Sequence, residues 1–320
     1  MRILWPHNFN PSIPAAGVFM RTTAKGLQNL GVDIQLEYLG DLRSPLSILR
    51  ARKNLKLMAK DFDIVHAQYG SACALVTSVI NDRPSIVTIR GNDWNTCNNN
   101  IGFEYWHTRL ARLMTKFTIN KFDGIIPVSK RIQKELIHHA PNAQFLVQPA
   151  PIELSMWPSR IIRSRLNNEK WVLHTNLRRD DPVKQYNLCT KVIDLVNKRT
   201  TGVKLRVASN VPHDKMPEFV SSCDVVLCTS ESEGWPNSIK EALACNVPFV
   251  STDVSDLAEI ANHESSCRVC SDDPELLAQN LYEVLQMSNV KNLRKYVEKM
   301  DITASSLKLL SFYEKLLKGF

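Results

Sequence analysis

The sequence predicts an α/β fold made of two domains, each built around an open parallel sheet. The 320 residues suit two domains of ordinary size better than one. Short runs rich in β-branched residues alternate with amphipathic stretches, the pattern of parallel α/β sheets. The alternation stops in a segment rich in Pro, Ser and Arg, residues 146–168, and then starts again. We therefore expect two Rossmann-like domains facing a central cleft, where tandem domains of this class normally bind ligands.

The first half of the chain alternates predicted strands with predicted helices. Its strand-like runs are RILW, VDIQLEYL, FDIVHAQ, SIVTIR, GIIPVS and AQFLV. Amphipathic stretches predict helices over residues 18–30, 46–60, 103–122 and 130–139.

The second half repeats the alternation. Its strand-like runs are KWVLHT, VKLRVAS, DVVLCTS, VPFVST and SCRVC. Helices are expected over residues 185–198, 214–222, 237–245, 255–262 and 273–287. The last segment is a further helix whose apolar face would consist of Leu307, Leu310, Tyr313 and Leu317. The chain has no GxGxxG or P-loop motif, so neither kind of phosphate-binding loop is available.

The composition excludes several classes of protein. With 44% hydrophobic residues the chain can bury real cores and is not expected to be disordered. Its polar start does not resemble a secretory signal, and no apolar run approaches the roughly 18 residues that span a bilayer. We therefore expect a cytoplasmic protein, soluble or peripheral on the inner face of the cytoplasmic membrane. The cysteines are expected to be reduced thiols, and the CRVC pair lacks the second pair that a zinc site needs.

The formal net charge of +8 indicates an anionic partner. Residues 42–60 and 109–121 are basic and contain no acidic residue, which favours an anionic membrane surface. A helix in the first stretch would have basic residues on one face and an apolar face made of Ile48, Ala51, Leu55 and Met58. The alternative is a core-packed helix with a solvated basic face. No nucleic acid partner is expected, because aromatic residues are not interleaved with these stretches as a stacking platform requires.

The stretch SESEGWPNSIKEALAC places two glutamates around a turn between a predicted strand and a predicted helix. The turn leads into a helix N-terminus, whose unpaired N–H groups and dipole bind an anion, typically a phosphate. Glu233 and Glu241 would accept hydroxyl hydrogen bonds on either side of it, and Gly234 would let the backbone approach the ligand. A ligand with a sugar at each end of a diphosphate fits this arrangement. The alternative is a capping box, in which Glu241 only satisfies the backbone of Ser238.

The longer stretch SEGWPNSIKEALACNVPFVSTDVSDLAEI resembles the carboxyl-terminal signature of the family 4 glycosyltransferases, retaining enzymes of the GT-B fold. Glu233 and Glu241 have the E-x7-E spacing of that family. AAGVFMRTTAKGLQNLGVDIQ, DIVHAQYG, GIIPVSK and RRDDPVKQYNL resemble its other segments. The resemblance implies an acceptor-binding domain over residues 1–150, a donor-binding domain over 151–303, and a crossover helix over 304–320 that packs back on the first domain.

The resemblance also implies roles for the donor-site residues. Glu233 would hold hydroxyls of the transferred sugar, and Glu241 the ribose of the nucleotide. Lys184 would neutralise the departing diphosphate together with Arg179, or with Arg178 because the spacing varies by one in the family. Breaking a glycosyl–phosphate bond puts negative charge on the leaving group, which fixed cations and helix amides stabilise. The diphosphate would lie against the backbone of Gly234, Trp235, Pro236, Asn237 and Ser238.

The chain departs from the family in several places. Many members have a histidine facing the reacting sugar where this chain has Arg90, which cannot act as a base but could bind a phosphate or an acidic acceptor. Asp93 lies in the same loop. His66 ends a predicted strand and either faces the cleft or is packed. Gly17 would bring the first loop near the donor phosphates. No metal is expected, because the adjacent aspartate pairs lack the Asp-x-Asp arrangement of metal-dependent transferases.

Together with these observations, the resemblance implies a retaining hexosyltransferase that needs no cofactor. It would move a sugar from a UDP- or GDP-sugar to a growing glycan or lipid-linked glycan of the lipopolysaccharide, capsule or exopolysaccharide type. One alternative is a catalytically silent GT-B subunit that binds nucleotide, with Arg90 as the mark of lost activity. Another is a nucleotide-sugar epimerase, which would need carboxylates and histidines in the cleft, and the E-x7-E context argues against it.

Overall fold

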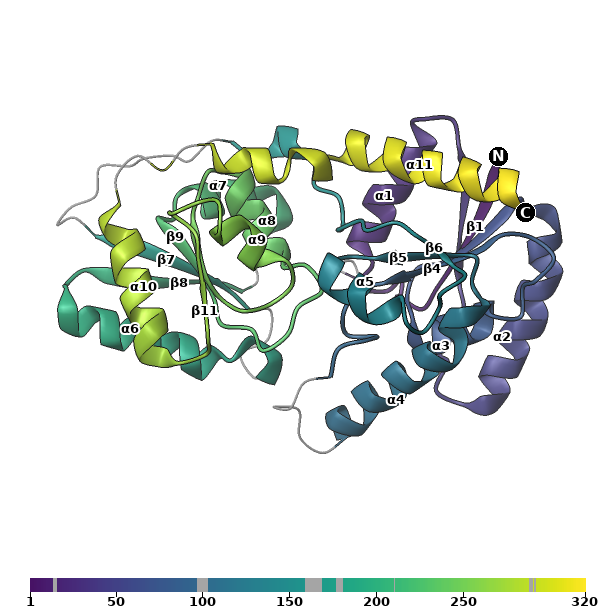
Figure 1. The fold of residues 1–320 in the computed structure, drawn as a ribbon, viewed down its shortest axis with the longest axis horizontal. Helices are drawn as coiled ribbons and strands as arrows, with labels where there is room; N and C mark the ends of the chain where they lie inside the picture. The colour runs from purple at the N-terminus through teal and green to yellow at the C-terminus, as the bar shows by residue number, and fades with distance from the viewer. Residues whose placement is uncertain are drawn as a thin grey trace. The chain divides into compact units, whose positions relative to one another are not determined.

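The computed structural model describes residues 1–13, 16–96, 103–158, 169–176, 181–209, 211–287, 290 and 292–320, with residues 103–105 and 213 as backbone only. The chain forms two compact units (Figure 1). Unit 1 comprises Met1–Pro151 and Ile302–Phe320, and unit 2 comprises Ile152–Asp301. Each contains one parallel sheet flanked by helices, as the alternating pattern predicts. None of the helices in the described ranges has the length and apolar character needed to cross a membrane.

The sheet of unit 1 has the strand order β2-β1-β3-β4-β5-β6. Its strands are β1 Arg2–His7, β2 Asp33–Tyr38, β3 Ile64–Ala67, β4 Ser85–Ile89, β5 Gly124–Pro127 and β6 Gln144–Phe145. Strand β1 pairs with β2 on one side and with β3 on the other, so the chain order reverses between β1 and β3. Ligands of open α/β sheets bind beyond the carboxyl ends of the strands at such a reversal.

The helices of unit 1 are α1 Val18–Gln28, α2 Pro45–Met58, α3 Ser71–Thr77, α4 Phe103–Thr118, α5 Lys130–Leu136 and α11 Ile302–Gly319. Helix α3 was not predicted from the sequence. Its seven residues, SACALVT, are mostly buried, so no polar face marks a helical period. Helix α3 packs against both α2 and α4.

Helix α2 buries the apolar face that could have lain on lipid. Ala51 and Leu55 are buried, and Ile48 and Met58 pack partly against the same core. This arrangement is the core-packed alternative for residues 46–60. The helix starts where the Ser44 hydroxyl accepts a hydrogen bond of 3.1 Å from the N–H of Ser47, with Pro45 in the first turn.

Helix α11 completes the core of unit 1 by packing along α1. Its buried residues are Ser305, Ser306, Leu309, Phe312, Tyr313 and Leu316. The predicted apolar face is confirmed in part: Tyr313 is buried and Leu310 and Leu317 pack partly against this core, whereas Leu307 is 51% exposed. The close approach of α1 explains the difference. A Cβ atom on Gly26 would lie only 2.2 Å from the Ser306 hydroxyl oxygen, so small residues face each other where the helices meet.

The sheet of unit 2 has the strand order β11-β10-β9-β7-β8. Its strands are β7 Lys170–Thr175, β8 Val203–Ala208, β9 Val225–Cys228, β10 Phe249–Thr252 and β11 Arg268–Cys270. Its helices are α6 Tyr186–Arg199, α7 Met216–Ser221, α8 Asn237–Ala244, α9 Leu257–Ala261 and α10 Pro274–Gln286. Strand β9 is buried along its whole length, and the chain order reverses between β7 and β9. The loops that follow these two strands are therefore the expected ligand-binding edge of unit 2.

Candidate functional site

Two loops meet at the carboxyl ends of β7 and β9. The loop after β7 contains a short 3-10 turn, Pro182–Lys184, and the loop after β9 begins at Thr229. The N–H of Glu231 donates a hydrogen bond of 2.8 Å to the carbonyl of Val183, and the Thr229 hydroxyl donates one of 2.8 Å to the carbonyl of Lys184. These bonds fix the backbones of the loops to each other, so the side chains that they carry have defined positions.

The Lys184 ammonium contacts Oε1 of Glu233, and the Ser230 hydroxyl donates a hydrogen bond of 2.9 Å to the same oxygen. The two charged side chains are 27% and 17% exposed, so they are sheltered but can still be reached from solvent. Burial alone would lower the pKa of Lys184, but the Glu233 carboxylate, with Cys228 and Asp181, outweighs burial and raises it. Lys184 is thus a fixed cation at neutral pH, next to a carboxylate oriented by two donors.

The turn after Glu233 leads directly into helix α8, which begins at Asn237. The preceding residue, Pro236, has no side-chain hydrogen bond to the first turn. The turn is held from below, because the Ser255 hydroxyl donates a hydrogen bond of 2.6 Å to the carbonyl of Gly234, and Trp235 packs partly on the core. The N–H groups of the first helical turn therefore have no side-chain cap, which is the condition for anion binding at a helix N-terminus.

The capping-box alternative for Glu241 is wrong. Ser238 is the second residue of α8 rather than its N-cap, so its side chain is not in the position from which a cap accepts hydrogen bonds. Glu241 lies one turn into the helix and is half-buried. Burial raises the pKa of Glu241 to about 7, although the neighbouring Lys240 lowers it somewhat. A half-buried carboxyl group without a capping role is free to accept ligand hydroxyls.

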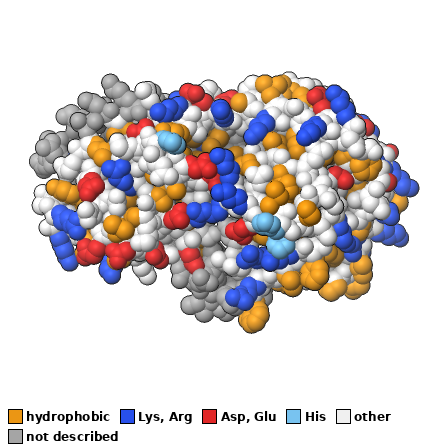
Figure 2. All heavy atoms as spheres, viewed as in Figure 1, with side chains coloured by type: hydrophobic (Ala, Val, Ile, Leu, Met, Phe, Trp, Pro, Cys, Tyr) orange, Lys and Arg blue, Asp and Glu red, His pale blue; other side chains and the backbone are white. Residues whose placement is uncertain are grey.

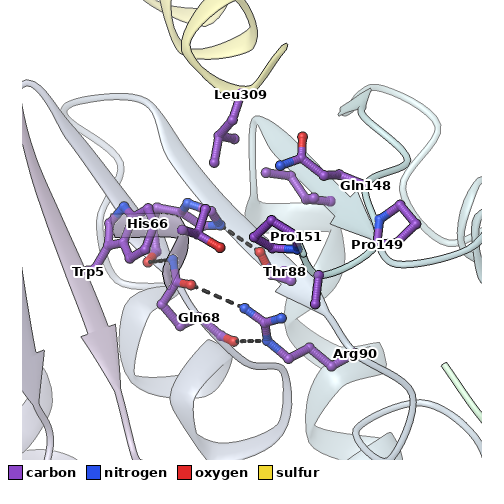
Figure 3. A pocket seen from close by; sticks show the side chains of 12 residues that line it. Trp5, His66, Gln68, Thr88, Arg90, Gln148, Pro149, Pro151 and Leu309 are labelled. Atoms are coloured by element: carbon purple, nitrogen blue, oxygen red, sulfur yellow. Dashed lines mark hydrogen bonds between the residues drawn. The ribbon is translucent and has the colours of Figure 1, made fainter. Parts of the chain in front are cut away.

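A separate pocket lies within unit 1, at the carboxyl ends of β1, β3 and β4 (Figure 3). Arg90 is in its wall, with Nε donating a hydrogen bond of 3.0 Å to the carbonyl of Gln68 and Nη2 one of 3.3 Å to Oε1 of Gln68. The guanidinium carbon lies 3.7 Å from the centre of the Phe19 ring. Burial lowers the pKa of Arg90 to about 9, so the side chain remains a cation at neutral pH.

His66 lines the same pocket but is locked in place. Its Nδ1 atom lies 2.6 Å from the Tyr313 hydroxyl and its Nε2 atom 2.7 Å from the Thr88 hydroxyl. Burial and then the nearby Arg90 hold the pKa of His66 well below its usual value. The packed alternative for His66 is therefore the one observed, and the ring is neutral at physiological pH.

Asp93 is fully buried and does not line the pocket. Its carboxylate accepts hydrogen bonds from three backbone N–H groups, those of Gly70 at 2.8 Å, Arg90 at 2.9 Å and Gly91 at 2.9 Å. Burial raises the pKa of Asp93, while these bonds oppose the rise. Asp93 thus fixes the loop that carries Arg90, which is a structural task rather than contact with a ligand.

Gly17 precedes the first turn of α1 in the left-handed conformation, with φ of 70°. A Cβ atom there would lie 3.1 Å from the Phe9 ring, so both backbone and space favour glycine. Among the described residues, no group of three or more His, Cys, Asp or Glu side chains could hold a metal ion.

Comparison with known proteins relates these sites to a family. Residues 17–155 match the model of the family described as Glycosyltransferase Family 4, and residues 184–287 match the model described as Glycosyl transferases group 1. The two matches do not overlap, and together they cover most of the chain, including Lys184, Glu233 and Glu241. The chain belongs to the family 4 glycosyltransferases.

This glycosyltransferase is similar to an uncharacterized glycosyltransferase of Methanocaldococcus jannaschii, with 22% identity over 261 residues that cover 76% of this chain and 70% of that protein. Among solved structures it is similar to sucrose-phosphate synthase from Thermosynechococcus elongatus, with a TM-score of 0.79 and 14% identity over 100% of both chains. It is also similar to Anabaena HepE in complex with UDP and glucose, with a TM-score of 0.69 and 14% identity over 99% of this chain and 100% of that one. The glycosyltransferase thus has the GT-B fold that its sequence predicts.

Some of the predicted residues of this glycosyltransferase lie outside the described part of the chain. Arg178 and Arg179, the alternative partners of Lys184, fall in the range 177–180 and receive no structural account. The next residue, Asp181, is described, and its Oδ1 atom accepts a hydrogen bond of 3.0 Å from the N–H of Val183. That bond starts the turn that carries Lys184.

One buried residue at the carboxyl edge of the unit 2 sheet was not predicted from the sequence. His174, near the end of β7, is 2% exposed, and its Nδ1 atom lies 3.1 Å from the carbonyl of Leu227. Burial and then the Lys184 charge lower its pKa, although the hydrogen bond opposes this. Its place in a strand-like run, KWVLHT, gave no sign that it would lie beside a functional lysine.

Proposed function

We propose that this glycosyltransferase is a retaining enzyme that moves a sugar from a nucleotide-sugar donor to a growing cell-surface glycan. The contact between Lys184 and Glu233, beside the uncapped N-terminus of α8, carries the proposal. It puts a cation, a carboxylate that accepts hydrogen bonds from hydroxyls, and a set of N–H donors at the carboxyl edge of the unit 2 sheet. A sugar diphosphate needs these three groups, because its leaving group gains negative charge while its sugar must be held by its hydroxyls.

In the proposed donor site, the two glutamates, the lysine and the helix N–H groups each bind a different part of the donor. Glu233 accepts hydrogen bonds from hydroxyls of the transferred sugar, and Lys184 stabilises the departing diphosphate together with the N–H groups at the start of α8. Glu241 accepts hydrogen bonds from the ribose. The bound UDP and glucose of the similar Anabaena protein support a nucleotide sugar as the donor class, with a UDP- or GDP-sugar as the substrate.

We propose that configuration is retained by front-face transfer, in which the acceptor oxygen attacks the anomeric carbon from the face that the phosphate leaves. The new carbon–oxygen bond forms as the bond to the phosphate oxygen breaks, and that oxygen keeps the electron pair. The acceptor proton passes to the same departing oxygen. No protein base is needed, which agrees with an arginine at position 90 and with a neutral His66 whose ring nitrogens both have partners.

We propose that the unit 1 pocket receives an anionic group of the acceptor. Within the described residues, the Arg90 guanidinium donates hydrogen bonds to Gln68, and no carboxylate forms an ion pair with it. Arginine binds carboxylate and phosphate in a two-pronged geometry that lysine does not reproduce. An acidic sugar or a phosphate-bearing lipid-linked glycan would supply such a group.

The silent-subunit reading remains the second candidate, and Arg90 is the observation that favours it. Arg90 stands in the pocket where many family members have a histidine. This replacement would remove the histidine but leave nucleotide binding intact. The two hypotheses differ in turnover, because a silent subunit binds the nucleotide but does not cleave the nucleotide-sugar donor to release it.

Donor turnover without an added acceptor tests the proposal. Purified protein would be incubated with UDP- and GDP-sugars, and the released nucleoside diphosphate and the anomer of the freed sugar would be followed by NMR. We expect slow release with one donor, an α-anomer first from an α-linked donor, and loss of release in Lys184→Ala. Lys204→Ala is the matched control, because Lys204 pairs with Glu169 at 3.7 Å elsewhere in unit 2. Inversion of the anomer would contradict retention, and nucleotide binding without donor turnover when an acceptor is also present would favour the silent subunit.

We also place the enzyme on the inner face of the cytoplasmic membrane, where lipid-linked glycans are extended. The net charge of +8 and the acid-free basic stretch that ends at Lys121 support an anionic surface as the partner.

A further inference from the structure

Helix α4 carries a line of large apolar side chains on its exposed face. Trp106 is 69% exposed, Leu110 51%, Leu113 50% and Phe117 70%. The successive spacings of four, three and four residues keep all of them on one face, because an α-helix turns once in 3.6 residues. Single exposed apolar residues are normal on a protein surface, but a continuous line of four marks an interaction site.

The opposite face of α4 holds the helix to unit 1. Ala111, Thr115 and Thr118 are buried. The Thr115 hydroxyl donates a hydrogen bond of 2.8 Å to the backbone carbonyl of Asp93, within the loop that carries Arg90. The core therefore needs only this face, and the apolar line does nothing for the packing of unit 1.

Basic residues flank the apolar line. Arg109 and Lys116 are exposed on one side of it, and Lys121 is exposed just beyond the helix. Residues 105–121 include no Asp or Glu. Figure 2 shows hydrophobic and basic side chains together over the region where Figure 1 places α4. A helix with an apolar face and lysine or arginine beside it is the pattern of helices that lie in the plane of a membrane interface.

We propose that α4 is the membrane-inserting element of this protein, with Trp106, Leu110, Leu113 and Phe117 in the boundary between headgroups and acyl chains of an anionic bilayer. Arg109, Lys116 and Lys121 then lie at the level of the lipid phosphates. The reason for membrane contact rests on the proposed function, but vesicle binding is measured independently of catalysis.

A lipid surface fits α4 better than a second copy of the chain. The buried centre of a protein–protein interface is depleted of charged residues, whereas cations here stand directly beside the apolar line. A symmetric contact through α4 would also bring the same cations of two copies together without acidic partners on this segment. An anionic bilayer neutralises those cations and accepts the apolar line at once.

Helix α2 offers a matched control on the same unit. Leu46, Leu49 and Leu57 are 67%, 59% and 57% exposed, comparable to the residues of α4. Lys53 lies among them on the same helix face, so they do not form an unbroken apolar line. Replacing them changes surface hydrophobicity by a similar amount on a different helix.

Vesicle sedimentation tests the proposal with the 320-residue chain. The wild type, the triple variant Leu110→Ser, Leu113→Ser, Phe117→Ser and the control Leu46→Ser, Leu49→Ser, Leu57→Ser would be mixed with phosphatidylcholine vesicles containing about a third phosphatidylglycerol, or none. We expect the wild type and the control to sediment with anionic vesicles within twofold of each other, and the α4 variant to bind at least tenfold more weakly. Equal binding by all three proteins, or equal loss in both variants, would overturn the assignment to α4.

Two further readouts complete the test. Brominated lipids should quench the wild-type tryptophan fluorescence, and Trp106→Phe should remove most of that quenching, since Trp106 is the exposed tryptophan of this helix. The absence of quenching, or a wild-type dimer in sedimentation velocity that the α4 variant abolishes, would overturn the proposal, the latter in favour of a second copy. Donor hydrolysis by the α4 variant should stay at the wild-type rate, so failure of the vesicle test and failure of the enzyme assay are distinguishable.

Discussion

The Lys184 ammonium and the Glu233 carboxylate contact each other across 49 positions of sequence. Each follows a central strand of the unit 2 sheet, β7 or β9, and the chain order of the sheet reverses between those strands. The pair therefore lies where an α/β sheet presents ligand-binding loops. A lysine and a glutamate paired only for stability could lie anywhere on the surface, so their position is what gives them a functional meaning.

Replacing either member of this pair should reduce donor turnover far more than it reduces stability. Lys184→Ala should lower the rate of nucleotide release by about 10²- to 10³-fold, the usual loss when one preorganised group at a developing charge is removed. The free energy of unfolding should change by only about 1 kcal/mol, because both side chains are partly exposed. Turnover assays and urea denaturation of Lys184→Ala, Glu233→Gln and the double variant would measure both effects. Additive losses of turnover in the double variant would contradict a shared task.

The ionised side chain of Glu241 should lower the free energy of unfolding but strengthen ligand binding. Its pKa of about 7 means that the folded protein keeps a proton on this group at pH values where the unfolded chain, with a pKa of 4.5, has lost it. The ionised carboxylate therefore weakens the fold increasingly as the pH rises from about 4.5 to about 7. Glu241→Gln should raise the free energy of unfolding at pH 8 by on the order of 2 kcal/mol. The same variant should bind nucleotide more weakly than the wild type.

Denaturation at pH 8 and pH 5 separates this effect from a general change in packing. The stabilisation by Glu241→Gln should be present at pH 8 and mostly lost at pH 5, where the wild-type carboxyl group is already protonated. An equal change at both values would mean that the raised pKa is not its source.

The sequence predicted the framework of the protein well, because that framework depends on local periodicity. Every strand predicted within the described residues is present, including KWVLHT as β7 and the core of DVVLCTS as β9. The pattern could not predict α3, whose seven residues are almost uniformly buried. It also placed Leu307 on the buried face of α11, where it is exposed, because that face is set by the close crossing of Ser306 over Gly26.

The candidate site was predictable only where spacing within one segment carries the meaning. The interval between Glu233 and Glu241 lies on one turn and one helix, and the structure removes the capping-box alternative by starting α8 at Asn237. Contacts between segments far apart in the sequence could not be predicted. Nothing in the sequence placed His66 between Thr88 and Tyr313, or gave Asp93 its backbone partners, because those neighbours are brought together by the tertiary fold.

Asp93 should prove to be a structural residue. Asp93→Asn replaces an acceptor-only group with one that presents an N–H₂ group towards backbone donors. We expect it to lower the free energy of unfolding by about 3 kcal/mol, given the worth of hydrogen bonds to charged groups. Urea denaturation should show a lower midpoint with an unchanged slope.

Gly70→Ala gives an independent check on the role of Asp93. The added Cβ atom would lie 2.7 Å from the Thr115 hydroxyl oxygen and 3.0 Å from the Asp93 carboxylate, so it should also be destabilising. Wild-type stability in both variants would show that the loop does not depend on this carboxylate.

His66 should make the protein less stable in mild acid. The unfolded chain takes up a proton on this residue near pH 6.5, whereas the buried ring, with its pKa well below that value, does not. The contribution of the neutral His66 ring to the free energy of unfolding is thus complete above pH 6.5 and is lost as the pH falls below that value. The free energy of unfolding should fall by about 1 kcal/mol between pH 7.5 and 5.5. His66→Gln should reduce this loss by that amount, and His263→Gln, which changes an exposed histidine, should not. Denaturant titrations at the two pH values give the comparison, and an identical pH dependence in His66→Gln would refute the buried, neutral ring.

The central claim is that unit 2 binds the diphosphate of a nucleotide sugar between Lys184, Glu233 and Glu241. Its most direct test is the thermal unfolding midpoint of the protein with UDP, GDP, ADP or CMP, since a ligand that binds only the folded state raises that midpoint. We predict that one nucleoside diphosphate stabilises the wild type and Lys204→Ala by several degrees and leaves Lys184→Ala and Glu241→Ala nearly unchanged. A wild-type midpoint that no nucleotide raises, or a shift that persists in both site variants, would contradict the claim.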